Sequence, residues 1–190
     1  MTIHLARHGQ TAFNHEGRFQ GHLPVALDAT GREQAHALAA AAAEVRLVSL
    51  WCSPLARARE TADIVAARIG LDPREDERLV ETDTGDWTGR SFADVRAEDP
   101  EGFARFQRSD RTFRYPGGES FAEQEARVLA ALDDLRARDR DLPALVVTHR
   151  GCIRLALTAA RGEREREREI PNAKLIELPD PAPGVPRAPR

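Results

Sequence analysis

Short apolar runs typical of buried strands alternate along this chain with longer segments whose apolar residues recur at helical spacing. The predicted strands are 3–6, 48–52, 145–147 and 175–178. The predicted helices cover about 30–45, 53–69, about 120–138 and 151–160. Strands joined by helices in this order require a parallel sheet with helices packed on its faces. The pattern therefore predicts an α/β protein, a three-layer α/β/α sandwich around a mostly parallel central sheet.

The predicted helix ends carry residues that favour helix termini. Ser53 precedes Pro54, so we expect Ser53 to cap the second helix and Pro54 to lie in its first turn. Gly70 is expected to end the same helix. Thr30 has a glutamate three positions later, the spacing of a capping box, although Asp28 is an alternative cap for that helix.

The middle and the end of the chain are less regular. Residues 72–118 hold most of the aromatic side chains, and we expect a short helical lid insertion over about 88–118. The run 161–169 alternates arginine and glutamate, which favours a solvated helix end or loop. Five of the twelve prolines lie in 179–190, which predicts a disordered tail after a domain that covers 1–178.

Charge and composition exclude several classes of function. The 190 residues include 28 Lys+Arg and 31 Asp+Glu, a net charge of −3 that argues against general nucleic-acid binding. The one lysine, Lys174, follows alanine rather than glycine, which excludes a Walker-type phosphate loop. No run approaches the ~18 apolar residues of a membrane span. Two distant cysteines make no disulfide framework, so we expect a reduced, cytoplasmic protein with no membrane partner.

Polar and charged residues follow three of the predicted strands. Arg7, His8 and Gly9 follow the first, the segment 53–57 follows the second, and the segment 148–151 follows the third. Ligands of open α/β sheets bind outside the carboxyl ends of the strands. We therefore expect two histidines and at least two arginines to face one crevice.

This combination of residue types suits phosphoryl transfer. Arginine holds phosphate oxygens with two N–H groups and stays charged at any working pH, while helix N-termini add N–H donors. A neutral imidazole can attack phosphorus, and neighbouring arginines disfavour a second positive charge on it. Taken singly, His149 reads as a structural histidine and Arg57 as a helix-surface arginine, so the prediction depends on their coincidence at three strand ends.

Other site chemistries fail on spacing. A cysteine-dependent phosphatase needs arginine six positions after its cysteine, but Cys52 is followed there by Ala58 and Cys152 by Thr158. The Gly-x-Ser-x-Gly elbow and the HExxH zinc motif are absent. We expect no metal site, and we expect both cysteines to be small buried hydrophobic residues.

The ordered set of motifs resembles the histidine phosphatase superfamily, the phosphoglycerate mutase-like group, over roughly residues 1–178. The matching positions are 7–11, Asn14, 17–21, 30–35, 53–62, Glu81 with 85–89, 117–120 and 147–154. The segment 118–120 looks most like the broad-specificity and α-ribazole phosphatase branch of that group. The resemblance implies the phosphoglycerate mutase-like fold, and it implies neither a metal nor a cofactor.

The resemblance also implies roles for individual residues. His8 is the expected nucleophile that becomes phosphohistidine, and Glu81 is the expected proton donor. The catalytic and phosphate-binding residues are expected to be Arg7, His8, Arg57, Glu81 and His149. Further substrate contacts are expected from Asn14, Gln20, Gly21 and Arg150. Arg150 departs from the small residue of many relatives, so it either reaches a substrate carboxylate or second phosphate or points to solvent.

Three functions are compatible with this set of residues. The first is a phosphomonoesterase that acts on a small phosphorylated metabolite, with water resolving the phosphohistidine. The second is a phosphoglycerate mutase, but mutases of the family have a basic Arg-His-Tyr-Gly stretch after the glutamate, where this chain has the acidic segment 82–87. The third is a regulatory protein without turnover, which the retained His8, Arg57 and His149 disfavour. Homodimers are frequent in the family, and that state stays open for this chain.

Overall fold

The computed structural model describes residues 2–162, 165 and 169–179, and its centre is a five-stranded sheet. The sheet order is β3-β2-β4-β1-β5, with bounds β1 Ile3–Arg7, β2 Ser49–Cys52, β3 Pro73–Glu75, β4 Ala144–Thr148 and β5 Ile176–Leu178. The pairs β1–β4, β2–β4 and β2–β3 are parallel, and β5 runs antiparallel to β1. The prediction of a mostly parallel sheet is confirmed. The predicted tail and most of the run 161–169 lie outside the described residues.

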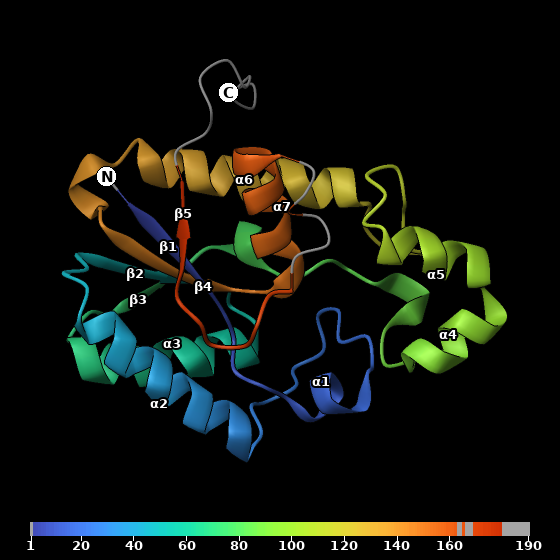
Figure 1. Ribbon diagram of the computed structural model, residues 1–190, viewed down its shortest axis with the longest axis horizontal. Coiled ribbons are helices and arrows are strands. Elements are labelled where there is room, and N and C mark those ends of the chain that lie inside the picture. Colours follow the sequence, from blue (N-terminus) through green and yellow to red (C-terminus); the bar gives the residue numbers. More distant parts are fainter. Residues whose placement is uncertain (1, 163–164, 166–168, 180–190) are drawn as a thin grey trace.

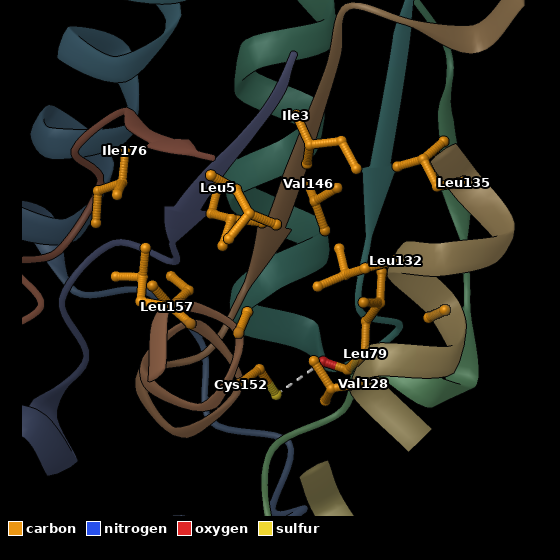
Figure 2. Packing of buried hydrophobic residues seen from close by; sticks show 14 of the residues in the cluster. Ile3, Leu5, Leu79, Val128, Leu132, Leu135, Val146, Cys152, Leu157 and Ile176 are labelled. Carbon is orange, nitrogen blue, oxygen red and sulfur yellow. Dashed lines mark hydrogen bonds between the residues drawn. The ribbon is translucent and has the colours of Figure 1, made fainter. Parts of the chain in front are cut away.

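Helices cover both faces of the sheet and make three layers (Figure 1). On one face lie α2 (Ala29–Ala43) and α3 (Ala56–Ile69), and on the other lie α6 (Phe121–Arg136) and α7 (Arg150–Arg161). The alternation of strand side chains explains the two cores, since residues i and i+2 share one face of a sheet. Ile3, Leu5 and Val146 pack with α6 and α7 (Figure 2). Leu145 and Val147 pack with α2 and α3.

The lid segment forms a third hydrophobic cluster away from the sheet. The lid segment contains α4 (Phe92–Glu98) and α5 (Pro100–Gln107), which lie with α1 (Ala12–Glu16) at one side of the molecule (Figure 1). Aromatic rings make most of this cluster, and Trp87 is only 3% exposed within it. The predicted helical lid insertion is therefore present, and its own core holds it together. Short 3₁₀ turns occur at Glu77–Leu79, Gly85–Trp87 and Asp139–Asp141.

Several local predictions are corrected by the structure. The second helix begins at Ala56 rather than at Pro54, and its N-cap is Leu55, so Ser53 does not cap it. Of the two predicted caps for α2, Asp28 is the one used, since its carboxylate accepts the Gly31 N–H at 2.7 Å. No helix was predicted within residues 8–27, where the structure has α1, and the irregular stretch after residue 72 contains β3. The other predicted elements are present with ends shifted by at most two residues.

Within the part of the chain that the structure describes, no helix has the length and apolar character needed to cross a bilayer.

Candidate active site

The carboxyl ends of three parallel strands place the motif residues side by side. Arg7 at the end of β1 is in register with Thr148 at the end of β4, and the His8 N–H donates to the Thr148 carbonyl at 2.9 Å. The Ser53 N–H after β2 donates to the Val147 carbonyl at 3.0 Å. Residues far apart in the sequence therefore meet at one edge of the sheet, as the position of the motifs predicted.

The His8 ring is buried and held in one orientation. Its Nδ1 lies 2.7 Å from the carbonyl oxygen of Gly9, so Nδ1 carries the proton and donates to that oxygen. The lone pair of the neutral ring is then on Nε2. The Asn172 side chain donates to the His8 carbonyl at 2.8 Å and fixes the backbone from the β5 side. His8 is thus presented as a nucleophile through Nε2.

The surroundings of His8 disfavour its protonation. The pKa of His8 lies well below its ordinary value because the ring is buried and because the Arg57 and Arg7 guanidinium groups add positive charge beside it. The backbone bond to Gly9 acts in the opposite direction and is the smaller effect. The imidazole is therefore neutral at working pH, which is the form that attacks an electrophile.

Two arginines with unused donors flank this ring. Arg57 is 1% exposed and donates to the carbonyls of Gly21 at 2.9 Å and Leu23 at 3.2 Å. Arg7 donates to the Ile170 carbonyl at 3.1 Å. The Nε atoms of both side chains are buried and have no acceptor among the described residues. Burial is the main cause that lowers the pKa of each guanidinium to about 10, so both side chains remain charged at neutral pH. Their free donors and positive charge suit a bound anion.

His149, the N-cap of α7, lies directly against His8. The two ring centroids are 5.2 Å apart, and His149 Nε2 lies 2.8 Å from the Ser53 hydroxyl. Its pKa is well below the ordinary value, chiefly through burial and then through Arg57. His149 is fully buried and does not line the pocket beside His8. Sequence reasoning missed the partner, because it assigned Ser53 to a helix cap.

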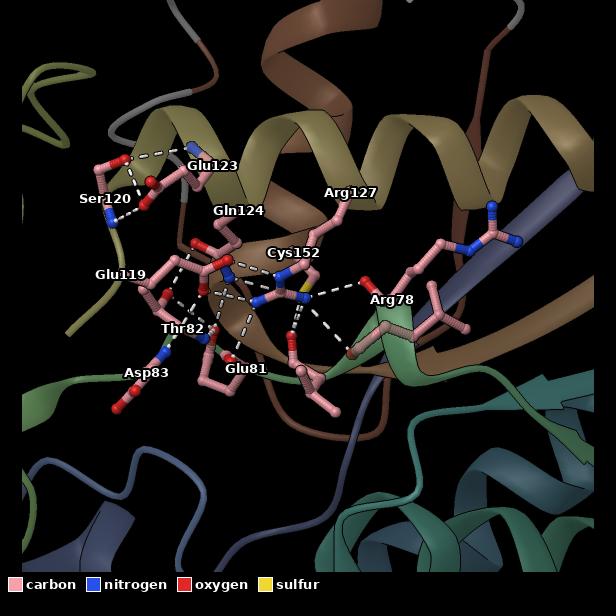
Figure 3. A network of polar contacts seen from close by, with 12 residues as sticks. Arg78, Glu81, Thr82, Asp83, Glu119, Ser120, Glu123, Gln124, Arg127 and Cys152 are labelled. Carbon is pink, nitrogen blue, oxygen red and sulfur yellow. Dashed lines mark hydrogen bonds and ion pairs between the residues drawn. The ribbon is translucent and has the colours of Figure 1, made fainter. Parts of the chain in front are cut away.

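The Glu81 carboxylate accepts hydrogen bonds from three residues, of which Thr82 and Gln124 are labelled in Figure 3. Its Oε1 accepts from the Thr82 N–H and from the Gln124 side-chain amide, both at 3.0 Å. Its Oε2 accepts the Gly151 N–H at the start of α7 at 3.4 Å. Glu81 lines the same pocket as His8. A carboxyl group and an imidazole on one pocket can serve as proton donor and nucleophile.

A partly buried arginine fixes the backbone that carries Glu81. Arg127 on α6 donates to the carbonyls of Arg78, Val80 and Glu81 at 2.9, 2.7 and 3.1 Å (Figure 3). Its other donors bind the Glu119 carboxylate at 2.7 and 2.8 Å. Neither residue was predicted for the site, and the sequence has no signal that joins α6 to the segment around residue 80.

The other predicted substrate residues also line the pocket. Asn14 on α1 accepts the Thr11 N–H through its side-chain oxygen at 3.2 Å, which turns its amide NH₂ away from that contact. Gln20 accepts the Thr11 hydroxyl proton at 3.0 Å. Gly21 has a positive φ of 48°, and a Cβ there would lie 2.7 Å from the Thr84 hydroxyl. The α1 segment, unexpected from the sequence, is what positions Asn14.

The pocket has a volume of about 280 Å³ and two kinds of wall. One kind is cationic and consists of arginines, and the other is aromatic and comes mainly from α1 and the lid segment. Lining residues that were not predicted include Arg18, Ser109, Arg154 and Asn172. Arg154 could have been found from spacing, since it lies four positions after Arg150 on one helix and therefore on the same face.

Metal ligands do not gather in this pocket. In residues 2–162, 165 and 169–179, no group of three histidine, cysteine, aspartate or glutamate side chains could hold a metal ion. Both cysteines are buried thiols, and burial raises their pKa, to about 12 for Cys52 and about 11 for Cys152. Their burial confirms the prediction that they are small core residues, although Cys152 also donates to the Val80 carbonyl.

Comparison with known proteins gives this arrangement a family. The histidine phosphatase superfamily (branch 1) matches residues 3–179. Phosphoglycerate mutase-like protein 4 of Arabidopsis thaliana is 34% identical over 91% of this chain and 76% of its own length. Glucosyl-3-phosphoglycerate phosphatase of Mycobacterium tuberculosis is 37% identical over 82% of this chain and 73% of its own.

Solved structures agree with the sequence comparison. The α-ribazole phosphatase from Shigella flexneri is 28% identical, with a TM-score of 0.82 over 93% of this chain and 89% of its own. The predicted family, fold and enzyme class are therefore confirmed. This chain belongs to the histidine phosphatase superfamily, branch 1, and is an enzyme of the phosphoric monoester hydrolase type.

Proposed function

We propose that this protein hydrolyses small phosphomonoesters through a phosphohistidine on His8, without a metal ion. One observation carries the proposal. The neutral His8 ring, with Nδ1 bonded to the Gly9 carbonyl, lies beside two charged arginines whose buried Nε–H groups have no acceptor within the described part of the chain. A phosphate dianion fits these donors and places its phosphorus opposite Nε2.

In the first step, the lone pair of His8 Nε2 attacks phosphorus and forms a P–N bond. The P–O bond to the substrate breaks, and the Glu81 carboxyl group donates a proton to the leaving oxygen. Arg7 and Arg57 stabilise the charge on the remaining phosphoryl oxygens. The alcohol product leaves, and His8 carries the phosphoryl group.

In the second step, the Glu81 carboxylate takes a proton from a water molecule, and the water oxygen attacks phosphorus. The P–N bond breaks, inorganic phosphate forms and His8 returns to its neutral state. Glu81 has regained the proton that it donated. The same residue serves both steps, which requires that its position stay fixed by Thr82, Gln124 and Gly151.

The size of the pocket supports a small substrate. Its volume of about 280 Å³ is at the lower end of the ~300–1,000 Å³ range of ligand pockets. We propose that the substrate is a small phosphorylated metabolite. We also propose that the protein works in a reducing cytoplasm, where its two buried cysteines stay free thiols.

Phosphoglycerate mutase activity is the second candidate, since the Arabidopsis thaliana relative is named phosphoglycerate mutase-like. In that reaction the bound product would take the phosphoryl group from His8 on another oxygen. The acidic segment 82–87 after Glu81 favours hydrolysis over this transfer.

The experiment is phosphate release from p-nitrophenyl phosphate at pH 5 to 8 with EDTA present, together with trapping of the protein-bound phosphate. We expect hydrolysis that EDTA does not reduce, and an acid-labile phosphoryl group on His8 that is lost in His8→Asn. Interconversion of phosphoglycerates without phosphate release would support the mutase instead. Turnover without a phosphoenzyme, or full activity in His8→Asn, would overturn the mechanism.

A further inference from the structure

The pocket carries more positive charge than one phosphate group needs. Its described lining residues include one carboxylate, Glu81, and five arginines: Arg7, Arg18, Arg57, Arg150 and Arg154. Arg7 and Arg57 flank His8 and serve the phosphate of the proposed reaction. A phosphate dianion balances the charges of these two arginines, and Arg18 pairs with Glu16 at 3.8 Å. The roles of Arg150 and Arg154 are then left unexplained by the proposed reaction.

Arg150 and Arg154 lie together on α7. They are four residues apart, so both side chains project from one face of the helix, and both line the pocket. Arg150 has no ion pair with any carboxylate of the described residues, whereas arginines outside the pocket such as Arg59 and Arg78 each bind two. Like charges at this spacing destabilise a helix, and a bound anion between them would remove that repulsion.

The positive charge of Arg150 lowers the pKa of two neighbouring arginines, Arg154 and Arg7. Burial lowers the pKa of Arg154 to about 10, and the positive charge of Arg150 is the next cause. Arg150 is also the largest charged contribution that lowers the pKa of Arg7, after burial. The two α7 arginines therefore act on the same volume as the phosphate-binding Arg7.

The lid segment holds one member of the pair in place. Arg154 Nη1 lies 3.4 Å from the Ser109 hydroxyl, in the loop after α5. Ser109 is 4% exposed and has a positive φ of 50°, a backbone conformation that is strained for residues other than glycine. Such strain persists where the surrounding structure enforces it. The contact sets the Arg154 side chain against the lid rather than in open solvent.

We propose that Arg150 and Arg154 form a second anion site, and that the preferred substrates are phosphomonoesters with a second anionic group, a carboxylate or a second phosphate. The inference rests on the proposed function, because the first phosphate is taken to lie at His8. Guanidinium groups bind both kinds of anion through paired N–H donors. This assignment makes α7 the element that selects substrate, while β1 and α3 supply the arginines of the reacting phosphate.

The test compares substrates that differ in one charged group. 3-Phosphoglycerate is compared with glycerol 3-phosphate, which has a hydroxymethyl group in place of the carboxylate, and fructose 1,6-bisphosphate with fructose 6-phosphate. The measured quantity is the ratio of kcat/KM within each pair. We expect the doubly anionic member to be preferred by about tenfold or more. The pair with the larger ratio tells whether the site suits a carboxylate or a phosphate.

The variants are Arg150→Gln and Arg154→Gln, with Arg161→Gln as the matched control on the last turn of the same helix. Arg161 is exposed, and its guanidinium contacts the Glu177 carbonyl away from the pocket. We expect each pocket variant to reduce the preference within a pair about tenfold, because one charge-assisted contact is removed. The control is expected to keep the wild-type ratio.

A binding measurement separates this inference from the proposed function. His8→Asn retains the arginines but has no nucleophile, and its dissociation constants for the same compounds need no turnover. Equal affinity and equal kcat/KM for both members of each pair would overturn the second anion site while leaving the hydrolase intact. An unchanged ratio in both pocket variants would also overturn it. Absence of hydrolysis with retained selective binding would overturn only the proposed function.

Discussion

Arg127 on α6 and Glu119, just before that helix, form a two-pronged ion pair with N–O distances of 2.7 and 2.8 Å. The remaining donors of Arg127 bind three backbone carbonyls, those of Arg78, Val80 and Glu81. The pair thus connects a helix on one face of the sheet to the segment that presents the proposed proton donor. The ion pair therefore helps to hold Glu81 in position. Glu81 can donate its proton only if its carboxyl group stays within reach of the leaving oxygen.

Glu81→Gln removes the proton that the leaving group needs. We expect kcat/KM for an alkyl phosphate such as glycerol 3-phosphate to fall about 10²–10⁴-fold, the usual worth of general acid–base catalysis. p-Nitrophenolate leaves without strong assistance, so the loss of phosphoenzyme formation with p-nitrophenyl phosphate is expected to be smaller. Burst kinetics on both substrates measure this difference. An equal loss on both would argue against Glu81 as the acid.

Arg127→Gln tests whether the arginine acts through Glu81. The partly buried Glu119 carboxylate would lose its partner, so we expect a destabilisation of about 2 kcal/mol in urea unfolding. Activity on the folded variant is expected to fall more on glycerol 3-phosphate than on p-nitrophenyl phosphate, as for Glu81→Gln. Arg136→Gln on the same helix is the control, since its ion pair with Asp133 lies outside the site. A uniform loss on both substrates would show a purely structural role for Arg127.

Gly151→Ala probes the space beside the same carboxylate. A Cβ at position 151 would lie 2.5 Å from Glu81 Oε1 and 2.9 Å from the Gln124 amide nitrogen, so the carboxylate must move. Alanine favours helix over glycine by about 1 kcal/mol, which offsets part of the steric cost in α7. We expect the thermal midpoint to change little while kcat on alkyl phosphates falls at least about tenfold. Retained kcat would mean that the position of Glu81 tolerates displacement.

The two buried histidines predict a specific dependence of stability on pH. The folded-state pKa values of His8 and His149 lie well below 6.5, so the folded protein leaves both neutral while the unfolded chain takes up protons below that pH. Their contribution to stability is therefore full above about pH 6.5 and is lost as the pH falls. Each histidine adds about 1.4 kcal/mol per pH unit to the slope below that point.

Urea unfolding of wild type and His8→Asn at pH 7, 6 and 5 measures this effect. We expect the variant to lose less stability on acidification than the wild type, by about 1.4 kcal/mol per pH unit below pH 6. His36→Gln, a change at an exposed position on α2, is expected to keep the wild-type slope. Parallel curves for wild type and His8→Asn would mean that His8 is protonated in the folded state.

Much of the fold followed from local patterns in the sequence. The apolar runs predicted four strands correctly, and the left-handed Gly70 ends α3 as expected from a residue without a Cβ. The short strand Pro73–Glu75 was missed because three residues give too little pattern. The helix α1 was missed because glycines before and after its five residues indicate a loop.

The sequence by itself determined the family, the order of the elements and the residues that follow each strand, because these depend on neighbours in the chain. Only the tertiary structure decided that the Ser53 hydroxyl is the hydrogen-bond partner of His149. The same holds for the contacts of Arg127 and Gln124 with Glu81, and for the place of Arg154 beside Arg150 at the pocket. Each of these contacts joins segments that no local preference links. Packing of two helical layers on one sheet brings them together, and burial then favours polar groups that find a partner or a ligand.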